Sequence, residues 1–218
     1  MIASGTPVRV DVWSDVQCIW CYIAGARLRA ALERSPVAVD VVYRSFQLSP
    51  DAPVEIDREA HIRRHGGDAA RMAQMLAHLE RLTTDEGLEY RPDRTRPTNS
   101  RAALELLHQA QAEGRRAELT QRLFEAHFAE GRHIGLVDEL LAIAGEVGLD
   151  RASAAASLAD ARWSTAVDAD VREARRLGAR GVPFYVIGGV ARLSGAPSVD
   201  DLLAAFEHAS RAVAVESI

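Results

Sequence analysis

The stretch Val16-Gln17-Cys18-Ile19-Trp20-Cys21-Tyr22 contains both cysteines of the chain, in a C-x-x-C spacing. Three interpretations are open: a redox pair, half of a metal site, or two core residues that happen to be neighbours. What such a spacing means depends on the elements that flank it. The segments on either side of the pair therefore decide both the fold and the chemistry.

The cysteines lie between two predicted strands. Apolar and polar side chains alternate over residues 8–13, and the alternation returns over 37–43, which is the period of a strand. Between these strands, Cys21, Leu28 and Ala31 fall on one helical stripe. Only short loops join the three segments, so they predict a β-α-β unit, most simply with parallel strands. Cys18 falls where the first strand ends and the helix begins.

The rest of the chain changes character twice. Residues 57–162 show helical periods interrupted by glycine and no strand pattern. A further helix ends near Gly178, and residues 184–187 and 190–193 read as two short strands around Gly188-Gly189, a strong hairpin signal. Ser198 and Asp201 then resemble a capping box that opens a last helix.

The predicted order is thus β-α-β, a helical insertion, and α-β-β-α. We expect an α/β fold with a discontinuous domain of residues 1–57 and 163–218, interrupted by an all-helical domain of residues 58–162.

Composition excludes several classes of function. The chain has 218 residues, 48% of them hydrophobic, and a net charge of −5 without a basic block, so a nucleic-acid partner is not expected. No apolar run approaches the ~20 residues of a membrane span, and the N-terminus does not resemble a secretory signal. Without a dinucleotide fingerprint or a phosphate loop, no cofactor is predicted. We expect a cytoplasmic protein, a compartment in which redox-active cysteine pairs are commoner than structural disulfides.

The position of the pair favours redox chemistry over the alternatives. Free N–H groups and partial positive charge at a helix N-terminus stabilise a thiolate, so Cys18 is expected to be reactive. Cys21 lies one turn further on, where it can attack a mixed disulfide and release the substrate. A structural disulfide here would close too short a loop to stabilise the fold much, and an unreactive core pair is disfavoured because Cys18 falls in a turn. His61 and His65 lie too far along the chain for a zinc-finger spacing, so no metal site is predicted.

Gly181-Val182-Pro183-Phe184 places a proline directly before a strand. Such a proline is often purely structural. In a chain that also carries C-x-x-C ahead of a helix, it favours a cis proline whose bend leaves the Val182 backbone unpaired and able to take a substrate as an extra strand. Trp20, expected to be exposed at the helix start, either packs on a substrate or shields Cys21.

Other residues receive plainer interpretations. Asp15 precedes the cysteine turn and could lie near the cysteines, but a solvated loop carboxylate or a turn-former is the favoured interpretation. Asn99 or Ser100 is expected to cap a helix, with Asn99 favoured as the cap. His127 is expected to be a hydrogen-bonded core or cleft-edge histidine. Met72 and Met75 follow helical spacing and are expected in the core.

Several motifs together resemble the DsbA family, in its FrnE-like branch. They occur in that family's order and cover nearly the whole chain: Ser14-Asp15, Cys18-Ile19-Trp20-Cys21-Tyr22-Ile23, Arg44-Ser45-Phe46-Gln47-Leu48-Ser49-Pro50, Asn99-Ser100-Arg101-Ala102, Phe124-Glu125-Ala126-His127-Phe128, Gly148-Leu149-Asp150, Gly181-Val182-Pro183-Phe184 and Ser194-Gly195-Ala196.

The resemblance implies a thioredoxin fold interrupted by a helical domain, and a thiol–disulfide oxidoreductase. It further implies that Cys18 is the nucleophile, Cys21 the resolving thiol and Pro183 a cis proline beside them. The expected partners are protein or low-molecular-weight thiols and disulfides, and the sequence leaves open whether the chain forms a homodimer.

Two departures and two alternatives accompany this resemblance. Ile19 stands where the branch usually has proline, and no histidine lies between the cysteines, so we expect a milder redox potential than that of strongly oxidising relatives. One alternative is an enzyme like the kappa-class glutathione transferases or 2-hydroxychromene-2-carboxylate isomerases, in which a serine usually replaces the first cysteine. The other is a non-catalytic thioredoxin-fold binding module.

Overall fold

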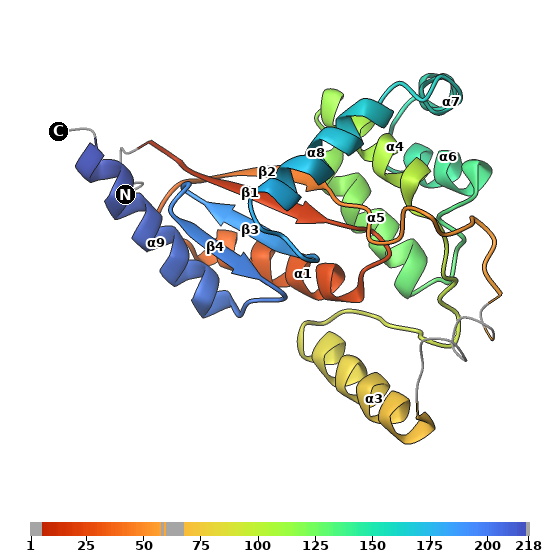
Figure 1. Cartoon of the computed structure of the whole chain (residues 1–218), viewed down its shortest axis with the longest axis horizontal. Coiled ribbons are helices and arrows are strands. Elements are labelled where there is room, and N and C mark those ends of the chain that lie inside the picture. Colours follow the sequence, from red (N-terminus) through yellow and green to blue (C-terminus); the bar gives the residue numbers. More distant parts are fainter. Residues whose placement is uncertain (1–5, 58, 60–67, 217–218) are drawn as a thin grey trace. The chain divides into compact units, whose positions relative to one another are not determined.

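The computed structural model describes residues 6–57, 59 and 68–216 (Figure 1). The chain divides into two compact units, one formed by Met1–Phe46 with Asp170–Ile218 and the other by Gln47–Ala169. No helix within the described residues has both the length and the apolar character needed to cross a membrane.

The boundary at Gln47 has a local cause. Asn99, in the helical unit, donates from Nδ2 to the carbonyls of Pro50 (3.2 Å) and Ala52 (2.6 Å) and accepts from Gln47 Nε2 (2.8 Å). Its Oδ1 also accepts from the Arg101 backbone N–H at 2.8 Å, so Asn99 provides the capping hydrogen bond at this helix start, although Ser100 occupies the N-cap position. Residues 47–52 are therefore tied to the helical unit.

The first unit is built on a four-stranded sheet with the order β2-β1-β3-β4. Its strands are β1 (Val8–Ser14), β2 (Val39–Ser45), β3 (Phe184–Ile187) and β4 (Ala191–Ser194). β1 is parallel to β2 and antiparallel to β3, and β3 and β4 form an antiparallel hairpin. The parallel β-α-β unit and the hairpin are thus confirmed. Gly188 and Gly189 have φ angles of 58° and 74°, as a two-residue turn with positive φ at both positions requires.

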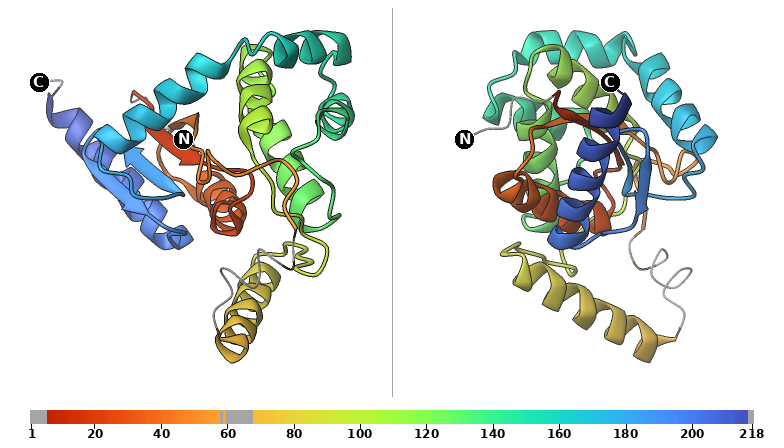
Figure 2. Two further views of the ribbon diagram at one scale, coloured as in Figure 1. Left: turned by 45° about the vertical axis from the view of Figure 1, so that its right-hand side comes forward. Right: turned by 90° about the vertical axis from the view of Figure 1, so that its left-hand side faces the viewer.

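Two helices cover one face of this sheet (Figures 1 and 2). They are α1 (Ile19–Arg34) and α9 (Val199–Glu216). Alternation along β1 sends Val8, Val10 and Val12 into the core that these helices share, together with Leu28 and Phe206. The predicted capping box at the start of α9 is present, since Asp201 N–H donates to Ser198 Oγ and Ser198 N–H to Asp201 Oδ2, both at 3.1 Å.

The opposite face of the sheet carries the other side chains of β1. Trp13 packs there with Phe184 and with Ala174 from the last turns of α8 (Ser164–Arg176). Its Nε1 donates to the Asp170 carbonyl at 2.9 Å. The strand end that precedes the cysteines is therefore fixed from both faces.

The second unit is helical. Its described part contains α3 (Ala69–Asp85), α4 (Arg101–Ala112), α5 (Arg116–Phe128), α6 (Val137–Glu146) and α7 (Arg151–Ala159), and α8 begins in it. Fully buried leucines such as Leu104, Leu119 and Leu140 form its interior. The helical periods of residues 57–162 do not single out α7, because its residues are mostly small and show no wide apolar stripe. Asp150 caps this helix by accepting from Ser153 N–H at 2.7 Å.

One core prediction in this unit is wrong. Met75 is 46% exposed, although Leu79, one turn further along α3, is buried. Helical periodicity indicates which residues share a face, but it does not indicate how far along the helix other elements cover that face.

Candidate active site

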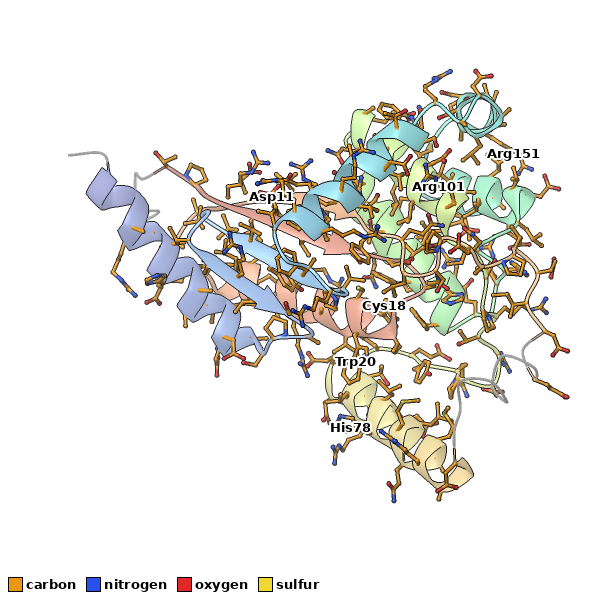
Figure 3. The ribbon with its side chains drawn as sticks, viewed as in Figure 1. Asp11, Cys18, Trp20, His78, Arg101 and Arg151 are labelled. Carbon is orange, nitrogen blue, oxygen red and sulfur yellow. The ribbon has the colours of Figure 1, made fainter. Side chains whose placement is uncertain are left out.

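The two cysteines lie at the junction between β1 and α1 (Figure 3). Cys18 is the N-cap of α1, with extended backbone (φ −92°, ψ 111°). Its carbonyl accepts hydrogen bonds from the N–H groups of Cys21 (2.9 Å) and Tyr22 (3.2 Å). The Cys18 side chain therefore belongs to the end of the helix where backbone N–H groups are free and the helix dipole is positive. Both side chains are buried, and they are thiols rather than a disulfide.

The two thiols differ in how readily they ionise. The hydrogen bond with Cys21 lowers the pKa of Cys18, and burial and the charge of Asp15 oppose this effect only in part. Burial raises the pKa of Cys21 well above its ordinary value, and the hydrogen bond with Cys18 acts in the same direction. When the pair loses one proton, the negative charge therefore resides on Cys18.

Pro183 lies close to this pair. The Val182–Pro183 peptide bond is cis, and Cys18 Sγ is 3.5 Å from the Val182 carbonyl oxygen. The Val182 carbonyl thus accepts from the Cys18 thiol, and the pairing of the Val182 backbone with a substrate strand stays a prediction. The Pro183 carbonyl accepts from Gly195 N–H at 2.9 Å, so the hairpin of β3 and β4 holds this segment beside α1.

Trp20 follows in the first turn of α1 and is 38% exposed, which confirms the exposure predicted for it (Figure 3). Ile19, the first residue of the helix, is half-buried. Ile19 and Trp20 thus give the first turn of α1 an apolar, partly exposed surface, whereas Cys18 and Cys21 are buried.

Asp15 is more deeply buried than the sequence predicts. It is fully buried instead of solvated, although it does form a turn, because its carbonyl accepts from Cys18 N–H at 3.0 Å. Its Oδ1 also accepts from Gln17 N–H at 3.3 Å. The spacing of three residues before a helix start was a signal for the turn, but burial depends on packing that local sequence does not specify.

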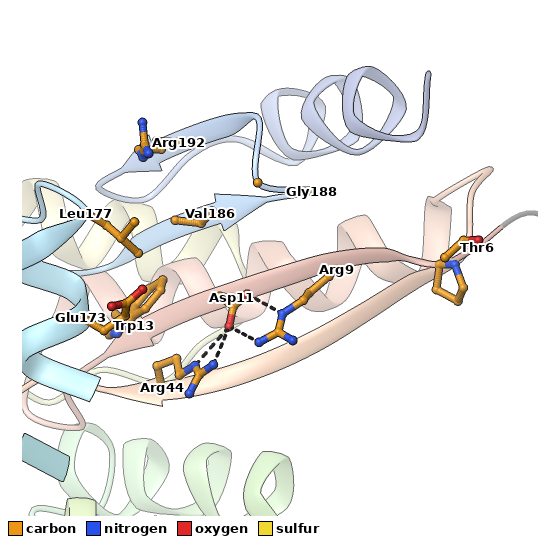
Figure 4. Close-up of a pocket in the computed structure, with 12 residues that line it drawn as sticks. Thr6, Arg9, Asp11, Trp13, Arg44, Glu173, Leu177, Val186, Gly188 and Arg192 are labelled. Carbon is orange, nitrogen blue, oxygen red and sulfur yellow. Dashed lines mark hydrogen bonds and ion pairs between the residues drawn. The ribbon is translucent and has the colours of Figure 1, made fainter. Parts of the chain in front are cut away.

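A separate hollow of about 470 Å³ lies on the face of the sheet opposite α1 (Figure 4). At its floor, Asp11 accepts from Arg9 Nε (2.7 Å) and Arg44 Nε (3.1 Å). Burial raises the pKa of Asp11, but the hydrogen bonds from both arginines outweigh this effect and keep it below its ordinary value. Arg44 also reaches Asp170 at 3.2 Å. These charges are mutually paired, and the cysteines do not line this hollow.

His61 and His65 lie outside the described residues, and within the part that is described no group of three or more His, Cys, Asp or Glu side chains could hold a metal. His127 is buried and hydrogen-bonded to the Arg132 backbone, as expected, but among the described residues its Nδ1 has no hydrogen-bond partner. Burial lowers the pKa of His127 to about 4, so this histidine is neutral near pH 7.

Comparison with known proteins places this geometry in a family. The chain matches the DSBA-like thioredoxin domain over residues 9–207. A probable DsbA oxidoreductase from Streptomyces coelicolor is 32% identical, with a TM-score of 0.88, over 93% of this chain and 89% of that one.

Two further structures show the fold alone because their identity is low. A 2-hydroxychromene-2-carboxylate isomerase is 20% identical, with a TM-score of 0.70, over 96% of this chain and 98% of that one. The cytosolic disulfide reductase DsbM from Pseudomonas aeruginosa, in a structure with GSH, is 21% identical, with a TM-score of 0.65, over 95% of this chain and 98% of that one. The FrnE-like branch stays a prediction. The α/β architecture with a helical insertion and the family match agree, and the chain belongs to the DSBA-like thioredoxin domain family.

Proposed function

We propose that the protein is a thiol–disulfide oxidoreductase in which Cys18 is the nucleophile and Cys21 the resolving thiol. The observation that carries this proposal is the asymmetry of the pair: the Cys18 pKa is lowered at the start of α1, and the Cys21 pKa is raised well above its ordinary value. A thiol that ionises readily is the better attacking and leaving group. Cys21, buried and protonated one turn further along α1, can then attack the mixed disulfide on Cys18 and release the substrate.

Exchange in the oxidising direction takes two steps. A substrate thiolate attacks Cys18 Sγ of the Cys18–Cys21 disulfide, and Cys21 leaves as a thiolate that takes up a proton. A second substrate thiolate attacks the substrate sulfur of the mixed disulfide, and Cys18 leaves as a thiolate. Two electrons pass from substrate to enzyme. The reducing direction reverses these steps, and Cys21 then gives up its proton as it attacks.

Three neighbouring residues are proposed to contact the substrate. The Val182 carbonyl and Pro183 face Cys18, so a substrate sulfur that reaches Cys18 also meets this segment. Trp20 offers an exposed aromatic surface in the first turn of α1. We propose protein or small-molecule thiols and disulfides as substrates, and the cytoplasm as the compartment.

The isomerase-like alternative has less support. Its solved representative shares the fold at low identity, which does not carry over its chemistry. Two thiols at the helix start are what disulfide exchange requires.

Trapping tests the proposal. Reduced Cys21→Ser protein is incubated with glutathione disulfide, and separately with a disulfide-bonded protein, and the products are identified by intact mass without reductant. We expect a stable mixed disulfide on Cys18, because no resolving thiol remains. The matched control, Cys18→Ser, retains only the poorly ionised Cys21 and should form far less adduct at pH 7. Equal labelling of both variants, or none, would contradict the proposal.

A further inference from the structure

The turn before the cysteines contains a carboxylate in an unusual place. Asp15 has no solvent exposure, and it lies three residues before Cys18. Its backbone carbonyl accepts from Cys18 N–H at 3.0 Å, and its Oδ1 accepts from Gln17 N–H at 3.3 Å. Gln17 Nε2 lies 3.5 Å from Asp15 Oδ2. The residue thus shapes the turn through both its backbone and its side chain, in the manner of an Asx turn.

This position sets two electrostatic effects against each other. The N-terminus of α1 stabilises negative charge on Cys18, whereas a carboxylate in the preceding buried turn destabilises it. Because neither group is exposed, solvent screens their interaction little.

We propose that Asp15 is a positioning residue of the cysteine pair: its side chain holds the turn that carries Cys18, and its negative charge limits how readily the Cys18 thiol ionises. The inference rests on the proposed function, since it concerns the nucleophile of that reaction.

Several neighbours of Cys18 raise or lower its pKa. The hydrogen bond with Cys21 is the largest influence and lowers the Cys18 pKa; burial opposes it, the Cys21 backbone assists it, and the charge of Asp15 opposes it. The Val182 carbonyl, 3.5 Å from Sγ, accepts a hydrogen bond only from the protonated thiol. The charge of Asp15 therefore disfavours the Cys18 thiolate, and removing that charge should lower the Cys18 pKa.

The consequence for redox chemistry follows from linkage. A more stable Cys18 thiolate stabilises the reduced protein and makes its disulfide a stronger oxidant. By destabilising that thiolate, Asp15 makes the disulfide a weaker oxidant than the helix N-terminus alone would produce. This agrees in direction with the milder potential expected from the sequence.

Asp15→Asn separates the two roles, because an asparagine oxygen can still accept from Gln17 N–H while the charge is lost. The Cys18 pKa of the reduced protein is measured from thiolate absorbance and from the pH profile of alkylation. We expect it to fall by about one pH unit, which corresponds to a roughly tenfold higher ratio of thiolate to thiol. The equilibrium with glutathione should move in the same sense, toward reduced enzyme.

Asp11→Asn is the matched control. It removes a carboxylate from β1 of the same unit, but one that is paired with Arg9 and Arg44 on the other face of the sheet. The Cys18 pKa should stay unchanged. Gln17→Glu is the opposite test: it replaces the side-chain amide that lies 3.5 Å from Asp15 Oδ2 with a second carboxylate, and it should raise the Cys18 pKa even if Asp15→Asn folds poorly.

An unchanged or higher Cys18 pKa in Asp15→Asn, or an unchanged one in Gln17→Glu, overturns the inference. So does an equal fall in Asp11→Asn, which would indicate a general effect of net charge. These titrations do not depend on turnover. If the wild-type protein exchanges no disulfide at all, the proposed function fails while the role of Asp15 is still decided.

Discussion

The carboxylates of the first unit lie in two different settings. On the face of the sheet opposite α1, Asp11 and Asp170 meet arginine: Arg44 bridges both, and Arg9 binds Asp11. At the end of β1, Asp15 accepts hydrogen bonds from Gln17 beside two thiols. The first arrangement pairs carboxylates with arginines, and the second places a carboxylate in the turn that carries Cys18, a thiol that must itself become negative.

The difference indicates that the ion-paired group contributes to stability, whereas the cysteine turn contributes to chemistry. Asp170 Oδ2 accepts from the Ser45 N–H at 2.8 Å, so the ion-paired group joins β2 to α8. In the cysteine turn, Cys18 contacts the Val182 carbonyl, and the two thiols differ in how readily they ionise. Perturbed ionisation of this kind is typical of functional sites.

The largest expected effect is at the nucleophile. Cys18→Ser removes the attacking sulfur, so disulfide exchange should fall by about a thousandfold or more. Its stability should change little, because serine is nearly the same size. Turnover of a dithiol peptide and urea unfolding are the measurements. Retention of a tenth of the activity would show that Cys21 or another group attacks first.

Asp170→Ala should produce the reverse pattern. It leaves the buried Ser45 N–H without its acceptor and Arg44 with one carboxylate fewer, which should lower the free energy of unfolding by about 2 kcal/mol. The Cys18 pKa should stay as in wild type. A shifted Cys18 pKa in a folded Asp170→Ala protein would show that the two groups are coupled, against the contrast drawn above.

The smallest effect is expected at the rim of the ion-paired group. Arg9 is 57% exposed, and Asp11 keeps Arg44 when Arg9 is lost. Arg9→Ala should therefore change the free energy of unfolding by less than about 1 kcal/mol, and less again at high salt. A loss as large as that of Asp170→Ala would mean that Arg9 is a main support of the ion-paired group.

Much of the fold could be predicted from the sequence because its signals are local. Alternation identified β1, Gly188-Gly189 the hairpin, and Ser198 with Asp201 the start of α9. The C-x-x-C pair and Pro183 identified the candidate site for the same reason.

What escaped prediction depends on contacts between distant segments. The burial of Asp15, the exposure of Met75 and the missing partner of His127 Nδ1 follow from how elements pack. The separate helix α7 was missed because alanine-rich segments carry little periodic signal. None of these is encoded in the spacing of neighbouring residues.

The pH profile of alkylation of the reduced protein tests the central claim, that the pair is asymmetric, most directly. Below the Cys18 pKa the thiolate fraction falls tenfold per pH unit, so labelling by iodoacetamide should rise with pH and level off below the ~8.5 of an ordinary thiol. Mass spectrometry should locate that label on Cys18 and leave Cys21 unmodified until much higher pH. Labelling of both cysteines together with a midpoint at or above ~8.5 would contradict the account.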